Sequence, residues 1–272
     1  MLSDYHVHTP LCRHAVGEPA EYVAAARSTE LDEIGFSDHC PMDGPEPFDD
    51  WRMDRADLPR YLAMIGQARA EAAPFPVRLG LECDFIAGHE GWIDKLSGMA
   101  DWDYLIGSVH YVAPGWDVDN PRFVARFNES PTAVNQIWTM YWLAYAKMAA
   151  SGLFDFLAHP DLPKKFGHRP AGDLRRFYEP AIAAAAKSGV AIEISTAGLR
   201  KPAGELYPAQ DFLGMASAAG LEIAINSDAH APEEVGLDFV RAADAARAAG
   251  FTHTLRFDRR QRRRVPLAAG TA

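Results

Sequence analysis

The sequence predicts an α/β fold in which parallel strands close into one barrel. Short apolar runs rich in β-branched and aromatic residues alternate with alanine-rich segments of helical periodicity, a pattern typical of a parallel sheet flanked by helices. This unit recurs seven or eight times within 272 residues, a length that one barrel domain can occupy. Because no shift in composition and no Ser/Gly-rich linker interrupts the pattern, we expect a single domain over residues 1–272.

The expected strands are short and bounded by loop residues. Seven of them have a clear apolar pattern, whereas an eighth candidate near the C-terminus is weaker. The seven ranges are 4–7, 33–37, 77–85, 104–110, 155–159, 191–195 and 222–227, and the weak candidate covers 252–257.

Helices are expected between these strands. Pro or Asp lies near several of their starts and Gly near several of their ends, as is common at helix boundaries. The ranges are 19–28, 57–73, 133–151, 172–189, 209–220 and 237–250.

Two connections are longer than the others, residues 40–54 and 111–130. Both are rich in Pro, Gly, Asp and aromatic residues, and loops of this length in a compact domain usually have a function. Their aromatic residues could form a lid over a site or could simply anchor the loops. These residues include Phe48, Trp51, Tyr111 and Trp116.

The composition, with 48% hydrophobic and 24% charged residues, is that of a soluble globular protein. No apolar run approaches the roughly 20 residues that cross a bilayer, and the N-terminal MLSDYHVH does not resemble an export signal. An odd number of cysteines, Cys12, Cys40 and Cys83, argues against a disulfide scaffold, and we expect them to pack as small buried groups. A cytoplasmic protein without a membrane segment is the expected outcome.

The formal net charge of −10 makes nucleic acid a disfavoured partner, because an acidic surface repels polyanions. The exception is an arginine-rich segment that begins at about residue 256 with RFDRRQRRR. We expect this segment to be a solvated tail or a final helix that lies against the acidic body. A contact with a phosphate backbone is the alternative.

Histidines and acidic residues recur at or just after the C-terminal ends of the expected strands. In a parallel barrel these ends open on one face, so residues distant in sequence converge there. Histidines that only cap helices or fill the core would be scattered instead. Neutral imidazoles suit zinc, manganese or iron, and carboxylates can bridge two ions. With His14 included, the set suits three ions with open positions for water and substrate: His6, His8, His14, His39, Glu82, His110, His159, Asp228 and His230.

The segments that carry these residues resemble the polymerase and histidinol phosphatase (PHP) superfamily. The matching blocks are DYHVHTPLCRHAVG at 4–17, GFSDHCP at 35–41, LGLECDF at 79–85, LIGSVHYV at 105–112 and NSDAH at 226–230. Two further blocks resemble its monofunctional histidinol-phosphate phosphatase branch, SGLFDFLAHPDLPKKFG at 151–167 and IEISTAGLRKPAGELYP at 192–208. The resemblance covers nearly the whole chain. It implies a distorted TIM-like (β/α)7 barrel with the metal site at the C-terminal ends of the strands.

The resemblance also implies a distribution of ligands over three divalent transition-metal ions, which could be Zn, Mn or Fe. The first ion would be held by His6, His8, Glu82 and Asp228; the second by Glu82, His110 and His159; the third by His14, His39 and His230. The implied activity is hydrolysis of L-histidinol phosphate to L-histidinol and phosphate, a step of histidine biosynthesis, by attack of metal-bound hydroxide.

Further roles are expected for residues in the matching blocks. Arg200, Lys164 and Arg13 are candidates to bind the substrate phosphate, since cationic side chains neutralise its charge. Asp161 could orient His159 or protonate the leaving alkoxide, and Glu82 and Asp228 belong to the catalytic set. No pattern in the sequence indicates a particular oligomeric state, so this state is left unknown.

Several alternative functions are open. One is a PHP-family nuclease that acts on DNA or RNA ends, which predicts a basic groove. Another is a phosphatase for a different small phosphomonoester or for phosphotyrosine. A third is a non-catalytic metal-stabilised module, which predicts missing ligands.

Overall fold

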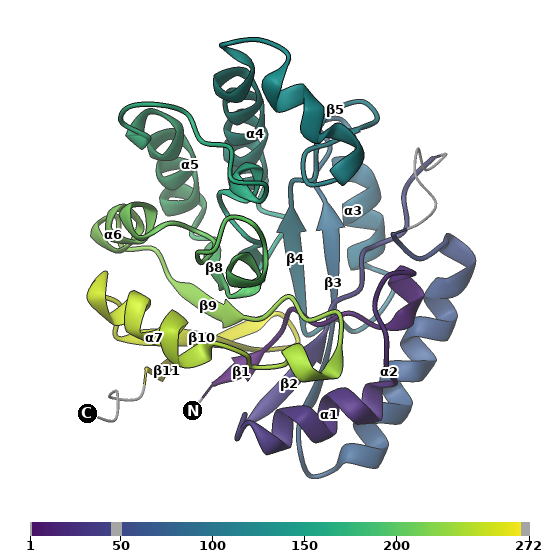
Figure 1. The fold of residues 1–272 in the computed structure, drawn as a ribbon. Helices are drawn as coiled ribbons and strands as arrows, with labels where there is room; N and C mark the ends of the chain where they lie inside the picture. The colour runs from purple at the N-terminus through teal and green to yellow at the C-terminus, as the bar shows by residue number, and fades with distance from the viewer. Residues whose placement is uncertain (1, 45–50, 268–272) are drawn as a thin grey trace.

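In the computed structural model, which describes residues 2–44 and 51–267, seven parallel strands form a nearly closed barrel (Figure 1). Phe48 lies outside the described residues. The hydrogen-bonded order is β1-β2-β3-β4-β7-β8-β9, which confirms the expected fold class. The strands are β1 (Ser3–Asp4), β2 (Glu33–Phe36), β3 (Val77–Asp84), β4 (Tyr104–Ser108), β7 (Phe156–Leu157), β8 (Ala191–Ser195) and β9 (Ile223–Asn226).

The barrel closes between its first and last strands, just beyond their C-terminal ends. Val7 and Ala229 form a parallel bridge. The amide of Ala229 donates to the carbonyl of His6 at 3.0 Å, and the amide of His8 donates to the carbonyl of Ala229 at 2.9 Å. The closing seam therefore sets two of the predicted site residues next to the segment that follows β9.

Helices surround the barrel (Figure 1). They are α1 (Pro19–Ser28), α2 (Leu58–Ala72), α3 (Glu90–Ser97), α4 (Ala133–Ala150), α5 (Arg175–Ser188), α6 (Gln210–Ala218) and α7 (Phe239–Ala248). All but α3 were expected. With eight residues, of which Trp92, Ile93 and Leu96 are buried, α3 is too short to show a helical period in the sequence.

Shorter elements occupy the connections. The 3-10 helices are η1 (Pro10–Cys12), η2 (Arg55–Asp57), η3 (Pro121–Asn128), η4 (Leu162–Lys164), η5 (Ala197–Arg200) and η6 (Pro232–Glu234). A small antiparallel hairpin of β5 (Tyr111–Ala113) and β6 (Trp116–Asp117) begins the second long connection. In the described part of the chain, no helix combines the length and the apolar character that crossing a bilayer requires. The three cysteines are free and buried, as expected.

The arginine-rich segment is neither a tail nor a helix, and this part of the prediction was wrong. It forms an antiparallel hairpin of β10 (His253–Asp258) and β11 (Gln261–Pro266), so the weak eighth strand exists but lies outside the barrel sheet. Leu255 and Phe257 of β10 join the apolar cluster inside the barrel, because alternate side chains of a strand point to the same face. The high charge of the segment favoured a tail or a helix, whereas the alternation of Leu255 and Phe257 with polar residues indicates a strand.

The arginines of this hairpin pair with acidic side chains of the body, as expected for a segment that lies against it. Arg256 pairs with Asp32, Arg260 with Asp155, and both Arg262 and Arg264 with Glu222. The hairpin thereby lies across the N-terminal ends of the barrel strands, on the side opposite to the strand ends that carry the predicted site.

Tyr104 fills the interior of the barrel, and two strand glycines make room for its ring. Its hydroxyl donates to the carbonyl of Tyr5 at 2.7 Å and lies 3.1 Å from that of Phe36. A Cβ atom added at Gly80 or Gly35 would overlap Tyr104. The barrel interior therefore depends on the absence of side chains at these two positions.

We expect Gly80→Ala to lower the free energy of unfolding by about 1–3 kcal/mol, since an added methyl group overpacks a filled core. Urea unfolding monitored by circular dichroism would measure the change. Gly66→Ala on α2 is the matched control, because nothing lies within 4 Å of a Cβ added there. Unchanged stability of the Gly80 variant would show that Tyr104 can move aside.

Candidate active site

Glu82 lies at the centre of the candidate site. It is fully buried on β3, two residues before that strand ends. The Nε2 atoms of His159 and His110 lie 3.0 Å and 3.5 Å from its Oε1 atom. His39 Nδ1 and His6 Nε2 lie 2.8 Å and 3.2 Å from Oε2. Imidazoles from the ends of four different strands thus converge on one carboxylate.

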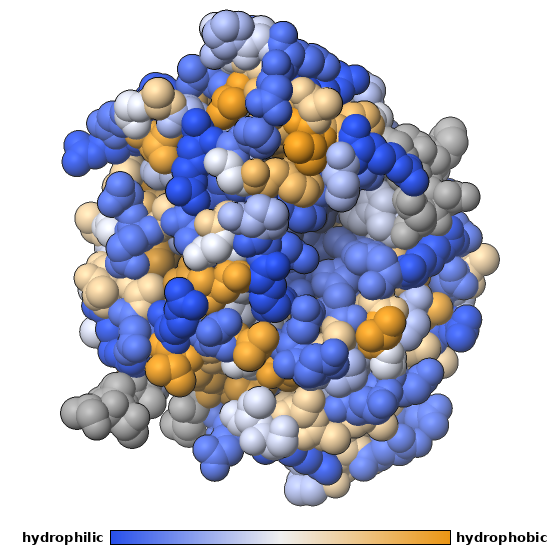
Figure 2. Space-filling view, in the orientation of Figure 1, coloured by the Kyte–Doolittle hydropathy of each residue, from blue (hydrophilic) through white to orange (hydrophobic). Residues whose placement is uncertain are grey.

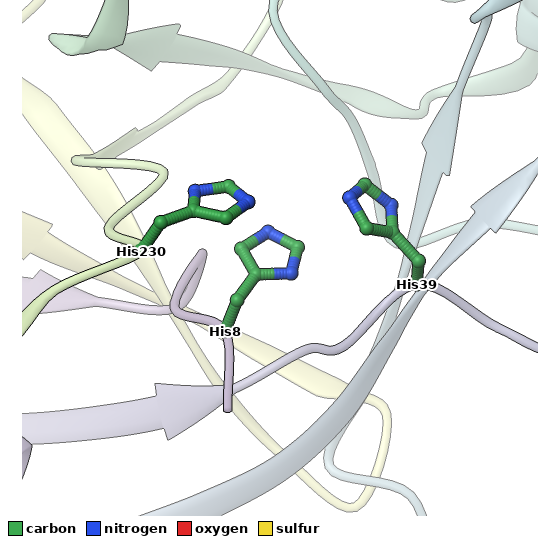
Figure 3. A group of neighbouring side chains, drawn as sticks. All are labelled: His8, His39 and His230. Atoms are coloured by element: carbon green, nitrogen blue, oxygen red, sulfur yellow. The ribbon is translucent and has the colours of Figure 1, made fainter. Parts of the chain in front are cut away.

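Asp228, which follows β9, is a second carboxylate of the cluster. Its Oδ1 atom lies 3.2 Å from His8 Nε2 and 3.6 Å from His230 Nδ1. The rings of His8 and His230 stack with centroids 4.1 Å apart, and the ring of His14 lies 4.4 Å from that of His230. Figure 3 shows His8, His39 and His230 directed toward a common space. The structure brings all nine predicted residues together.

Several polar atoms of this cluster are buried and make no well-aligned hydrogen bond among the described residues, although some of them lie at ion-pair distance from Glu82 or Asp228. They are His6 Nε2, both ring nitrogens of His8, His39 Nδ1, His230 Nε2 and Glu82 Oε2. A buried polar atom without a partner costs roughly 1–3 kcal/mol, so a group of them is unfavourable unless something binds to it. Three-residue groups such as His8, His39 and His230 have possible ligand atoms within 4.8 Å of one another. The donor set therefore fits divalent cations.

The protonation states of Asp228 and His230 suit the same purpose. Burial acts to raise the pKa of Asp228, but the charge of His6 and the close contact with His8 outweigh burial and hold this pKa well below its ordinary value. Burial, together with the neighbouring His8, lowers the pKa of His230 to about 3. At neutral pH, Asp228 is therefore ionised and His230 is neutral, which are the states in which these groups bind metal ions.

Two acidic residues that the sequence reasoning missed hold the histidines in place. Glu193 Oε1 lies 2.8 Å from His6 Nδ1, and Glu193 Oε2 accepts a hydrogen bond of 2.7 Å from the amide of His159. Asp84 Oδ1 lies 2.6 Å from His110 Nδ1. Such partners fix the orientation of metal-binding imidazoles. A signal was available for Asp84, because the strand period of two places it on the same face as Glu82.

A cavity of about 530 Å³ opens over the cluster. Figure 2 shows a hollow surrounded by hydrophilic residues on this face. Besides residues of the cluster, its lining includes Trp51, Asp117, Asp119, Lys165 and Tyr207. Both long connections therefore reach the cavity, as their length and composition indicated. The cavity is of the size that small-molecule sites have, roughly 300–1,000 Å³.

Lys165 lines the cavity, whereas the predicted Lys164 does not. The ammonium group of Lys164 is buried and lies 2.9 Å from Asp161 Oδ2 and 2.8 Å from the carbonyl of Leu206. Lys165 Nζ lies 2.7 Å from Asp119 Oδ2 in the wall of the cavity. The backbone conformation of η4 places the side chain of Lys165, and not that of Lys164, in the cavity wall. The sequence alone does not distinguish these two orientations.

Arg200 contacts the backbone of the segment that carries Asp228. Its Nη2 atom donates to the carbonyls of Ser227 at 2.8 Å and Asp228 at 3.3 Å. Its Nη1 atom is buried and has no hydrogen-bond partner within residues 2–44 and 51–267. Arg13 pairs with the exposed Asp54 near the surface. Of the two arginines, Arg200 contacts a residue of the cluster, Asp228, whereas Arg13 pairs with a residue outside it.

Asp161 is fully buried and does not line the cavity. Its carboxylate accepts hydrogen bonds from Lys164 Nζ at 2.9 Å, the Tyr178 hydroxyl at 3.2 Å and the amide of Ala209 at 3.0 Å. These bonds anchor the loop that follows His159. This placement supports a positioning role, and acid catalysis by Asp161 stays a prediction.

The order and spacing of these residues match a known protein family. The sequence model of the PHP domain matches residues 4–197, which is most of the chain. The chain belongs to the PHP domain family. The matched region of this PHP domain contains His6, His8, Glu82, His110 and His159, whereas Asp228 and His230 lie beyond it.

Relatives of this PHP domain extend the comparison to nearly the full length. A protein of Deinococcus radiodurans described as a probable histidinol-phosphatase is 44% identical over 251 residues, which cover 92% of this chain and 94% of that protein. The histidinol-phosphatase of Bacillus subtilis is 27% identical over 258 residues, covering 86% of this chain and 95% of that protein.

The fold of this PHP domain is also found in a solved structure. The crystal structure of histidinol phosphate phosphatase from Lactococcus lactis, complexed with zinc, L-histidinol and phosphate, superposes with a TM-score of 0.82. The two chains are 22% identical, and the match covers 96% of this chain and 98% of that one. This agreement confirms the expected distorted barrel.

Proposed function

We propose that this PHP domain hydrolyses L-histidinol phosphate to L-histidinol and phosphate, a reaction of histidine biosynthesis. The observation that carries the proposal is the cluster of seven histidines around Glu82 and Asp228 beneath a cavity sized for a small phosphomonoester. The names of the relatives at 44% and 27% identity agree with this substrate.

The donor set supports three divalent transition-metal ions, with zinc, manganese and iron as candidates. We assign one ion to His6, His8, Glu82 and Asp228, one to Glu82, His110 and His159, and one to His14, His39 and His230. When bound, such ions lower the pKa of water to near 7 and neutralise the charge of a phosphoryl group. Glu82 contacts members of all three sets, which supports a bridging role.

The surrounding residues of the chain prepare this site for a dianionic substrate. Glu193 and Asp84 hold the rings of His6 and His110. Lys165 supplies positive charge in the cavity wall, and Arg200, which does not line the cavity, pairs through Nε with Glu234 at 3.1 Å. Its Nη1 atom, which has no hydrogen-bond partner among the described residues, is the candidate to bind a phosphoryl oxygen. A guanidinium group suits this purpose because it can contact two oxygens at once.

A substrate panel tests the proposal. We expect the metal-loaded protein to release phosphate from L-histidinol phosphate with a kcat/KM at least about 100-fold above that for p-nitrophenyl phosphate or a phosphotyrosine peptide. This expectation follows because a cavity built around one substrate discriminates by its polar contacts. Short single-stranded DNA should stay intact under the same conditions. Faster turnover of DNA ends or of the peptide would overturn the assignment.

The charge distribution gives the nuclease alternative no support. The arginines at positions 256, 260, 262 and 264 already pair with acidic side chains, and their hairpin lies at the end of the barrel opposite to the cavity. The cavity wall itself contains Asp117 and Asp119. A polyanion would therefore meet acidic groups beside the cluster.

A further inference from the structure

Tyr207 is held rigidly beside the cluster. Its amide and carbonyl exchange hydrogen bonds of 3.0 Å and 2.7 Å with the backbone of Ser195, at the end of β8. Its ring packs over Gly198, where an added Cβ atom would lie 3.1 Å from the ring. The side chain is 1% exposed and lines the cavity, with its ring centroid 6.5 Å from that of His159.

The hydroxyl group of Tyr207 is the unusual feature. It is buried and has no hydrogen-bond partner in the described part of the chain. Nearby buried tyrosines differ: the hydroxyls of Tyr141 and Tyr145 donate to the carbonyls of His159 and Ala158, and that of Tyr178 donates to Asp161. Buried hydroxyls are normally paired, so a buried hydroxyl without a partner on a residue that lines a ligand cavity points to a partner on the ligand.

The environment fixes the chemistry of this hydroxyl. Burial raises the pKa of Tyr207, and the negative charges of Asp119 and Asp228 raise it further. The phenol therefore stays protonated throughout the neutral range and can donate a hydrogen bond. A donor in this position complements an acceptor, and the phosphoryl oxygens are the strongest acceptors that the proposed substrate carries.

We propose that the Tyr207 hydroxyl donates a hydrogen bond to the phosphoryl group of the substrate, beside His159. The inference rests on the proposed function for the identity of the substrate, but only the phosphoryl group is required for the contact. Sequence reasoning missed this residue because a tyrosine twelve positions after a strand has no distinguishing pattern.

Tyr207→Phe tests the inference, since it removes only the hydroxyl. A lost hydrogen bond to a charged group corresponds to roughly a 10- to 150-fold effect. We expect a loss of that size in kcat/KM for histidinol phosphate, and weaker binding of inorganic phosphate to the metal-loaded protein by calorimetric titration. The metal content should not change. The melting temperature should stay equal or rise, because the variant no longer buries an unpaired hydroxyl.

Tyr61→Phe is the matched control. The hydroxyl of Tyr61 is buried but donates to the carbonyl of Gly80 at 2.9 Å, away from the cavity. This variant should lose thermal stability and keep its phosphate affinity and activity. Phosphate affinity of Tyr207→Phe within twofold of wild type would overturn the inference, as would a fall in melting temperature like that of the control without a loss of phosphate binding. If wild type failed to hydrolyse histidinol phosphate, the proposed function would fail, while the phosphate titration would still decide the role of Tyr207.

Discussion

Glu82→Gln is expected to lower kcat for histidinol phosphate by more than about 100-fold while the protein stays folded. Replacing residues that merely orient metal ligands typically costs 10- to 100-fold in metal affinity or activity, and the carboxylate of Glu82 lies within 3.6 Å of five imidazoles. The glutamine keeps the shape of the side chain but removes a negative charge and one cation-binding oxygen. Steady-state kinetics at matched metal content would measure the loss.

Glu179→Gln provides the comparison, because Glu179 is an exposed residue on α5. It makes the same chemical change outside the site and should leave kcat and the melting temperature unchanged. Near-wild-type turnover of the Glu82 variant, with the same number of ions bound, would contradict a bridging role for this carboxylate.

Removal of metal is the second change with a large expected effect. Dialysis against a chelator should abolish phosphatase activity and lower the melting temperature, since the buried nitrogens and carboxylate oxygens around Glu82 would then lack partners. Elemental analysis of the active protein should show up to three transition-metal ions per chain. Activity should return when zinc, manganese or iron is added back.

The count of ions separates the possible arrangements. A preparation that is fully active with at most one ion per chain would rule out the three-ion assignment. Activity that survives exhaustive chelation, verified by elemental analysis, would rule out metal-dependent hydrolysis at this site altogether.

The sequence predicts the barrel and the cluster for the same physical reason. Parallel strands share a direction, so residues placed after each strand meet at one face regardless of their separation in the chain. His6 and His230 could therefore be placed together before any contact was known. The barrel strands are buried on both faces, so each of them reads in the sequence as a short apolar run with β-branched or aromatic residues, and this pattern locates the seven strands.

Contacts that depend on single turns could not be predicted in this way. Glu193 lies inside a strand and cannot be distinguished by position from a core residue until its partner His6 is located. Lys164 and Lys165 are neighbours, and only the geometry of η4 separates them. β10 was expected as a weak strand, but β11 and its pairing with β10 were missed because the arginines of the segment indicated a charged tail or helix.

The contacts of Tyr5, near the N-terminal ends of the barrel strands, affect how the chain folds during synthesis. The amide of Tyr5 donates to Asn226 Oδ1 at 2.8 Å, and the amide of Phe257 donates to the Tyr5 hydroxyl at 3.2 Å. β1 is only two residues long, so on a ribosome it can pair with β2 early, whereas Asn226 and Phe257, which bond to the adjacent Tyr5, are made more than two hundred residues later. Contacts between such distant positions form slowly. The nascent protein therefore carries His6 and His8 in an incomplete barrel until the segment that follows β9 has been made, and its metal centre assembles late.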